Sequence, residues 1–327
     1  MDYLATTLLH LKIENYNGAL AFPKEDDTIF YLLYQHATQI EVIESFGYRK
    51  NFGLIHVATF WDNLTSIVKG EGLSNDISER TKEMYNHHFK NKYFSNALWF
   101  IKDNSVIPYF TTISSNEKIA PQITKSSTYY TLSNGKIEDV IFTIEEIEAA
   151  FFWMEVLKTN SIQIKGERKV NPDKIDNFAL APYSETTSFN RAFQYLDAVR
   201  QETFLPAKIA SYISILEILC AVNGENTYKV SERVAALLGE NSDEKINLFN
   251  NVKKAYDFRS KYVHGAHINY AETSKISDIS VGLDDIVRRV LKTMIQNYPH
   301  LNYSNKNKES FMNFEGVDKE FIKLVLG

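Results

Sequence analysis

The sequence predicts an α+β protein in which a mainly β domain, residues 1–185, precedes an all-α helical domain, residues 186–327. Three observations support this prediction. The chain has 327 residues, enough for two domains that each bury a core. It has only 13 glycines and 7 prolines, which predicts mostly regular secondary structure. Short β-branched and aromatic runs dominate the first 140 residues, and longer amphipathic runs follow residue 187.

Strands are predicted where β-branched, leucine and aromatic residues gather between turn signals such as Asn17-Gly18 and Asn134-Gly135. A hairpin is expected across the Asn134-Gly135 turn, and a polar stretch predicts one helix among the strands. The expected strands are Leu4–Ile13, Thr28–Tyr34, Ala97–Ile101 and Val106–Ile113; the hairpin joins Tyr129–Leu132 to Ile137–Phe142, and the helix covers Ser78–Phe89.

The pattern changes at Thr143, where Thr143-Ile144-Glu145-Glu146 fits a capping box that starts a helix reaching about Lys158. An irregular polar segment up to residue 186 then marks the domain boundary. After it, glycines and prolines mark the ends of successive helices, because glycine adopts the left-handed conformation after a helix and proline cannot continue one. The predicted helices are Ser188–Thr203, Ala207–Val222, Tyr228–Leu238, Asp243–His264, Leu283–Tyr298 and Val317–Leu326.

Composition excludes several classes of protein. A single cysteine cannot form an internal disulfide, and no apolar run approaches the roughly 18 residues of a membrane helix. Asp2 stands where a signal peptide carries positive charge, so we expect a soluble cytoplasmic protein. The net charge of -5 belongs to the first domain, because residues 187–327 hold 18 Lys and Arg against 17 Asp and Glu. A nucleic-acid partner is therefore expected at the second domain.

The predicted helix Asp243–His264 carries the most informative motif. On a helical wheel Arg259 falls within an apolar stripe, where a guanidinium needs an anion, a carboxylate or an interface. His264 follows five residues later, in the last turn before Gly265, where the helix C-terminus stabilises an imidazolium. Such a pair suits phosphodiester chemistry, in which arginine holds the phosphate and histidine moves a proton. The other residues of the stripe are Leu248, Val252, Ala255, Tyr256 and Val263.

A structural interpretation fits the same two residues. Arginines on helix stripes often pair with a carboxylate of a neighbouring helix, and Glu217 is the obvious partner here. Histidines are also common in the last turn of a helix. Spacing alone favours this structural interpretation.

Three segments, in this order, resemble the HEPN superfamily and specifically its Apea-like branch. They are Ser211–Leu219 (SYISILEIL), Val230–Gly239 (VSERVAALLG) and Tyr256–Gly265 (YDFRSKYVHG). The last segment contains the R-x4-H signature of the superfamily as Arg259 and His264. The likeness covers about residues 187–300 and does not extend to the first domain.

The resemblance implies an all-helical domain that commonly dimerises with its R-x4-H helices facing each other. Many members are metal-independent endoribonucleases in antiphage defence or toxin systems, which use the ribose 2′-hydroxyl and leave a cyclic phosphate. It implies that Arg259 binds phosphate, that His264 acts as acid or base and that Glu217 orients Arg259. Ser260, where active members often have Asn, Asp or His, supports the site. The first domain is then expected to sense a phage-derived or nucleotide trigger or to restrain the nuclease.

Two functions stay open, an RNA-cleaving homodimer without cofactor or metal, and a non-catalytic HEPN module that dimerises or binds a nucleotide or a protein. Lys253, Lys254, Lys261 and Tyr262 are candidate contacts to an RNA backbone and its bases, although a solvated helix face explains the lysines equally well. The adjacent His87 and His88 lack ligands at metal-binding spacing and predict a solvated helix.

Overall fold

The computed structural model describes residues 2–15, 19–22, 30–34, 64–70, 76–115, 122–126, 128–160, 186–220, 226–265, 275–304 and 311–327. Contacts divide the chain into two compact units. The first contains residues 1–132 and 136–156, and the second contains residues 133–135 and 157–327. The division therefore falls within a helix, before the predicted boundary at residue 185. Residues 161–185, next to that predicted boundary, lie outside the described ranges.

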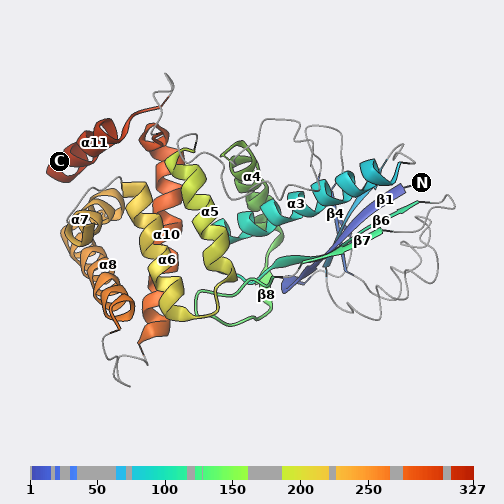
Figure 1. Cartoon of the computed structure of the whole chain (residues 1–327), viewed down its shortest axis with the longest axis horizontal. Coiled ribbons are helices and arrows are strands. Elements are labelled where there is room, and N and C mark those ends of the chain that lie inside the picture. The colour runs from blue at the N-terminus through green and yellow to red at the C-terminus, as the bar shows by residue number, and fades with distance from the viewer. Residues whose placement is uncertain are drawn as a thin grey trace, which may run out of the picture. The chain divides into compact units, whose positions relative to one another are not determined.

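The first unit is built on an antiparallel sheet whose described strands lie in the order β3-β4-β5-β1-β6-β7 (Figure 1). β1 is central and pairs with β5 on one side and β6 on the other. A separate short parallel pair joins β2 to β8. The strands are β1 (Asp2–Leu9), β2 (Leu11–Ile13), β3 (Ala19–Phe22), β4 (Phe30–Tyr34), β5 (Leu64–Gly70), β6 (Ile107–Ser115), β7 (Gln122–Lys125) and β8 (Val140–Phe142).

Helix α3 (Ile77–Ile101) packs along β1 and β6. Asp76 caps its start by accepting the Ser78 N–H at 2.8 Å. The prediction of a strand over Ala97–Ile101 was wrong, because these residues form the last turns of α3. Ala97, Leu98, Trp99 and Phe100 are all buried, so this end of the helix is apolar all round and shows no helical period in the sequence.

The predicted hairpin across Asn134-Gly135 was also wrong. Gly135 takes φ +81° in a tight turn that the Leu132 N–H closes on the Lys136 carbonyl at 2.8 Å, but no ladder of strand hydrogen bonds continues from it. Val140–Phe142 instead pairs in parallel with β2. With α3 along the sheet and α4 (Ile144–Asn160) packed against α3, the described part of the first unit is mixed α and β rather than mainly β.

The two adjacent histidines of α3 do not form a solvated face. His87 is buried, and the Asn91 Nδ2 donates to its carbonyl at 2.9 Å. His88 is half-buried, with Nδ1 2.9 Å from the Thr111 hydroxyl, which in turn lies 2.9 Å from the Thr6 hydroxyl. Burial, helped by nearby Lys92, holds the pKa of His88 below its ordinary value. The solvated interpretation was therefore wrong, since His87 is buried and His88 contacts β6 through Thr111.

The capping box of α4 is confirmed. The Thr143 N–H donates to the Glu146 carboxylate at 3.0 Å, and the Glu146 N–H donates to the Thr143 hydroxyl at 3.2 Å. These reciprocal bonds satisfy two of the amide groups that a helix start leaves free.

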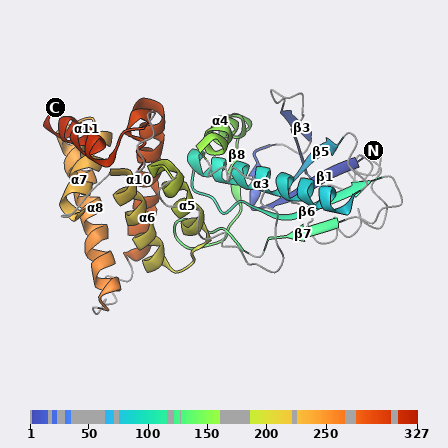
Figure 2. The same cartoon turned by 45° about the horizontal axis from the view of Figure 1, so that its top comes forward.

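The second unit is helical throughout its described elements (Figure 2). α6 contacts α5, α8 and α10, and α7 lies against α8. Pro206, in the first turn of α6, separates it from α5, as proline fits a helix start but not an interior. The helices are α5 (Ser188–Gln201), α6 (Leu205–Cys220), α7 (Asn226–Leu238), α8 (Ser242–Val263), α10 (Ile276–Asn297) and α11 (Phe314–Leu326), with the 3₁₀ turn η2 (Pro299–Leu301).

A charged pair is buried where α6 meets α10. Asp284 is 2% exposed, accepts the Tyr212 hydroxyl at 2.7 Å and pairs with Arg288, one turn further along α10. α11 is fixed in a similar way, because Arg233 of α7 pairs with Asp318 and lies over the Phe321 ring. Arg288 and Arg233 thus each have an opposite charge beside them, which offsets part of the cost of burying a guanidinium.

Gly239 ends α7 for a reason that the sequence analysis did not predict. Its φ is not positive, so the left-handed conformation expected there was wrong. Its N–H donates to the Ala235 carbonyl at 2.9 Å, and a Cβ would lie 2.8 Å from that oxygen and 2.4 Å from the Lys245 Cγ. Glycine is required by close packing of the chain after α7.

We therefore expect Gly239→Ala to destabilise the protein by about 1–3 kcal/mol, because backbone atoms must move to admit the methyl group. Urea unfolding monitored by circular dichroism measures the change. Gly282→Ala is the matched control, since a Cβ there meets nothing within 4 Å. Equal stability of the two variants would contradict the packing explanation.

Candidate functional site

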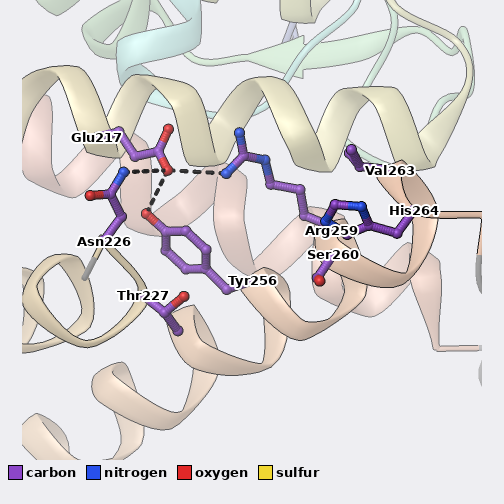
Figure 3. A pocket seen from close by; sticks show the side chains of 8 residues that line it. All are labelled: Glu217, Asn226, Thr227, Tyr256, Arg259, Ser260, Val263 and His264. Atoms are coloured by element: carbon purple, nitrogen blue, oxygen red, sulfur yellow. Dashed lines mark hydrogen bonds and ion pairs between the residues drawn. The ribbon is translucent and has the colours of Figure 1, made fainter. Parts of the chain in front are cut away.

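The residues singled out in the sequence meet in a pocket of about 320 Å³ between α6, α7 and α8 (Figure 3). α8 contributes one face of its C-terminal half, α6 a single carboxylate and α7 its first two residues. The lining consists of Glu217, Asn226, Thr227, Tyr256, Arg259, Ser260, Val263 and His264. Four residues expected from the sequence, Glu217, Arg259, Ser260 and His264, are thus brought together.

Glu217 organises the pocket through one of its two carboxylate oxygens. Its Oε1 accepts from Arg259 Nη1 at 3.0 Å, from Tyr256 Oη at 3.1 Å and from Asn226 Nδ2 at 3.3 Å. Figure 3 shows the three bonds converging on that oxygen, while Oε2 accepts none among the described residues. Three donors fix the orientation of the carboxylate and leave its second oxygen unused.

Arg259 satisfies the need for a partner through the ion pair with Glu217, as the structural interpretation predicted. The pair is not deeply buried, because the side chains are 33% and 20% exposed. Among the described residues Arg259 binds Glu217 through Nη1 alone, which leaves the other donors of the guanidinium to bind a ligand. The expected apolar stripe ends early: Val263 was assigned to it, but its side chain is 60% exposed.

His264 lies just beyond α8, at its C-cap. Its N–H donates to the Ser260 carbonyl at 3.0 Å, and Gly265 follows with φ +68°, the left-handed conformation predicted for this glycine. The imidazole is exposed and lines the pocket. In Figure 3 the Glu217 carboxylate, the Arg259 guanidinium and the His264 imidazole lie in a row. The guanidinium points toward Glu217, and His264 lies at the opposite end of the row.

Tyr256 is 6% exposed, and its hydroxyl donates to Glu217. Burial, the charge of Glu217 and this hydrogen bond raise the pKa of Tyr256 far above its ordinary value, against a smaller opposing effect of Arg259. The hydroxyl therefore keeps its proton over the whole physiological range. It serves as a fixed donor to Glu217 rather than as an acid or a base.

The residues proposed for RNA contact lie outside the pocket lining. Lys253, Lys254 and Lys261 are exposed on α8, as a solvated helix face requires. Tyr262 is half-buried and meets Phe204 edge to face, with 5.6 Å between ring centroids. The structure thus separates these four residues from the pocket that holds Arg259 and His264.

Sequence analysis missed the roles of Asn226 and Thr227 and understated that of Tyr256. The predicted helix began at Tyr228, so the first two residues of α7 were assigned to a loop. Tyr256 was recognised only as part of the apolar stripe. The spacing of Tyr256 could have predicted its role, because Tyr256 and Arg259 are three residues apart on the helix and face the same neighbouring helix.

Cys220, at the end of α6, is fully buried, and burial raises the pKa of its thiol to about 12, against a smaller opposing effect of Arg233. We expect no reaction of the folded protein with a disulfide reagent at pH 8, because the thiol is neither exposed nor ionised. One equivalent is expected to react after unfolding in urea, as measured by release of the coloured thiolate. Rapid labelling of the folded protein would contradict this burial.

Among the residues that the structure describes, no three His, Cys, Asp or Glu side chains are grouped to hold a metal ion. No helix in the described ranges is both long and apolar enough to cross a membrane. Comparisons of the chain with protein-family models, with curated proteins and with solved structures gave no match.

Proposed function

We propose that this protein is an endoribonuclease of the HEPN type, which cleaves RNA without a metal ion in antiphage defence or toxin-like action. The observation that supports the proposal most is the meeting of Arg259 and His264 in one pocket open to solvent. Their spacing also fits the R-x4-H signature that the sequence resembles. The volume of about 320 Å³ is small for a ligand pocket and suits a phosphodiester with its ribose.

In this proposal each side chain has a separate task. Arg259 binds the non-bridging phosphate oxygens with the part of its guanidinium that Glu217 does not use. The ribose 2′-hydroxyl attacks the adjacent phosphorus, and His264 takes part in proton transfer. Glu217 and Tyr256 hold Arg259 in place, and Ser260 lines the same pocket. The active form is proposed to be a homodimer through the helical unit, and the first unit to respond to a trigger.

The test is cleavage of labelled single-stranded RNA in the presence of EDTA. Wild type is expected to cleave, whereas His264→Ala is expected to lose about 10²–10⁴-fold in rate, the usual contribution of a general acid or base. His300→Ala is the matched control, since His300 is an exposed histidine that does not line the pocket. Cleavage that survives His264→Ala, or that requires added metal, would overturn the proposal.

A second candidate function is a non-catalytic HEPN module that dimerises or binds a nucleotide or protein. The ion pair between Arg259 and Glu217 favours it, because that contact gives the guanidinium a structural role. This candidate predicts that no RNA is cleaved. It also predicts that Arg259→Ala loses folding or assembly, which light scattering coupled to size-exclusion chromatography detects.

A further inference from the structure

We propose that Glu217 is the general base and His264 the general acid of RNA cleavage in this pocket, an inference that rests on the proposed function. It gives Glu217 a direct part in the reaction in addition to its contact with Arg259. The Glu217 carboxylate, the Arg259 guanidinium and the His264 imidazole all line the same pocket.

The reaction itself requires two groups on opposite sides of the phosphate. When the 2′-oxygen attacks, the 5′-oxygen leaves from the opposite face of phosphorus, so the group that accepts the first proton stands across from the group that donates the second. Figure 3 shows this order, with Glu217 at one side of the Arg259 guanidinium and His264 at the other end of the row. A phosphate held by Arg259 then lies between a carboxylate and an imidazole.

The hydrogen bonds of Glu217 favour the role of base. Three donors occupy Oε1 and orient the carboxylate, while Oε2 accepts none among the described residues and belongs to a pocket-lining side chain. A carboxylate oxygen is a hydrogen-bond acceptor and can take up the proton of a substrate hydroxyl. Asn226 and Tyr256 are positioning residues, since they act through Glu217.

The position of His264 favours the role of acid. It follows α8, whose C-terminal carbonyls place partial negative charge at this end of the helix, and it lies across the Arg259 guanidinium from Glu217 (Figure 3). The charged side chains that face the pocket are Glu217 from α6 and Arg259 from α8; Tyr256 stays neutral, and α7 contributes the uncharged Asn226 and Thr227.

In the proposed reaction one proton moves to Glu217 and another leaves His264. The 2′-hydroxyl proton passes to Glu217 Oε2 while the bond from O2′ to phosphorus forms. The bond from phosphorus to O5′ breaks, and the leaving oxygen takes the proton of the His264 imidazolium. The products are a 2′,3′-cyclic phosphate and a 5′-hydroxyl. The Arg259 guanidinium offsets the charge that develops on the non-bridging oxygens.

The experiment uses an oligonucleotide with one scissile ribonucleotide, prepared with either oxygen or sulfur at the 5′ bridging position. Sulfur leaves as a thiolate and needs no proton. On the oxygen substrate both His264→Ala and Glu217→Gln are expected to lose at least about 100-fold in rate. On the sulfur substrate His264→Ala is expected to return to within about tenfold of wild type, whereas Glu217→Gln stays impaired.

Recovery of Glu217→Gln but not of His264→Ala would overturn the assignment, as would equal behaviour of the two variants. If wild type cleaves neither substrate, the proposed function itself fails.

Discussion

Replacing Arg259 with lysine is expected to lower the kcat/KM of RNA cleavage by about 10²–10³-fold, although the positive charge is kept. The reason lies in the shape of the guanidinium. Arg259 donates through Nη1 to Glu217, and its other donors make no hydrogen bond within the described parts of the chain and are proposed to bind the phosphate. An ammonium is a single point charge and cannot hold a carboxylate and a phosphate in the same fixed geometry.

The measurement is initial-rate cleavage of a fluorescent RNA by Arg259→Lys beside a matched control. Arg289→Lys serves as that control, because Arg289 is a half-exposed arginine of α10 that pairs with Glu244, away from the pocket. We expect the control to keep wild-type activity. If Arg259→Lys retains activity within threefold of wild type, the forked geometry has no role and the charge alone is sufficient.

Replacing Asp284 with asparagine is expected to destabilise the protein by about 3–5 kcal/mol, the usual loss when one partner of a buried pair is removed. Asp284 is 2% exposed and Arg288 has a side chain 11% exposed, so water cannot replace the lost carboxylate. Tyr212 also loses a charged acceptor. The effect is on stability alone, because none of the three lines the pocket.

Urea unfolding measures this loss, with Asp285→Asn as the control. Asp285 is the next residue of α10 and is exposed, so its replacement is expected to change stability by less than about 0.5 kcal/mol. The double variant Asp284→Asn with Arg288→Met should recover part of the lost stability, because it removes the unpaired charge as well. A destabilisation below about 1 kcal/mol in Asp284→Asn would contradict the role given to the pair.

Much of the helical unit was predictable, because its helices carry a clear period and distinct ends. α5, α7 and α8 start or end within two residues of their predicted bounds, and Gly265 has the expected positive φ. The start of α10 was placed at Leu283 rather than Ile276, since no recognisable cap precedes it: Lys275 makes no side-chain capping bond. Helix propensity and the residues that end helices suffice to predict the bounds of a helix where its ends are marked in the local sequence.

The first unit was harder to predict because tertiary contacts decide its elements. Ala97–Ile101 has the composition of a strand, yet it continues a helix whose end is buried on all sides. Val140–Phe142 pairs with β2, far away in sequence, rather than with its neighbour across the turn. Neither outcome can be read from a local period, since strand pairing depends on partners more than 100 residues away.

The candidate site was predictable in its chemistry but not in its full geometry. An arginine on a buried stripe demanded a partner, and Glu217 is that partner at 3.0 Å. The convergence of Tyr256 and Asn226 on the same oxygen depends on how α6, α7 and α8 pack, which no single-helix pattern contains. The exposure of Val263 likewise depends on the packing of α8 against its neighbours.

The pocket of Arg259 and His264 is proposed to cleave RNA through the ribose 2′-hydroxyl. Mass spectrometry of RNA incubated with the protein in EDTA tests this claim most directly, because the chemical ends record which oxygen attacked. We predict fragments that carry a 2′,3′-cyclic phosphate and a 5′-hydroxyl, and none of them with His264→Ala. Intact RNA, or fragments with 5′-phosphate and 3′-hydroxyl ends, would contradict the claim.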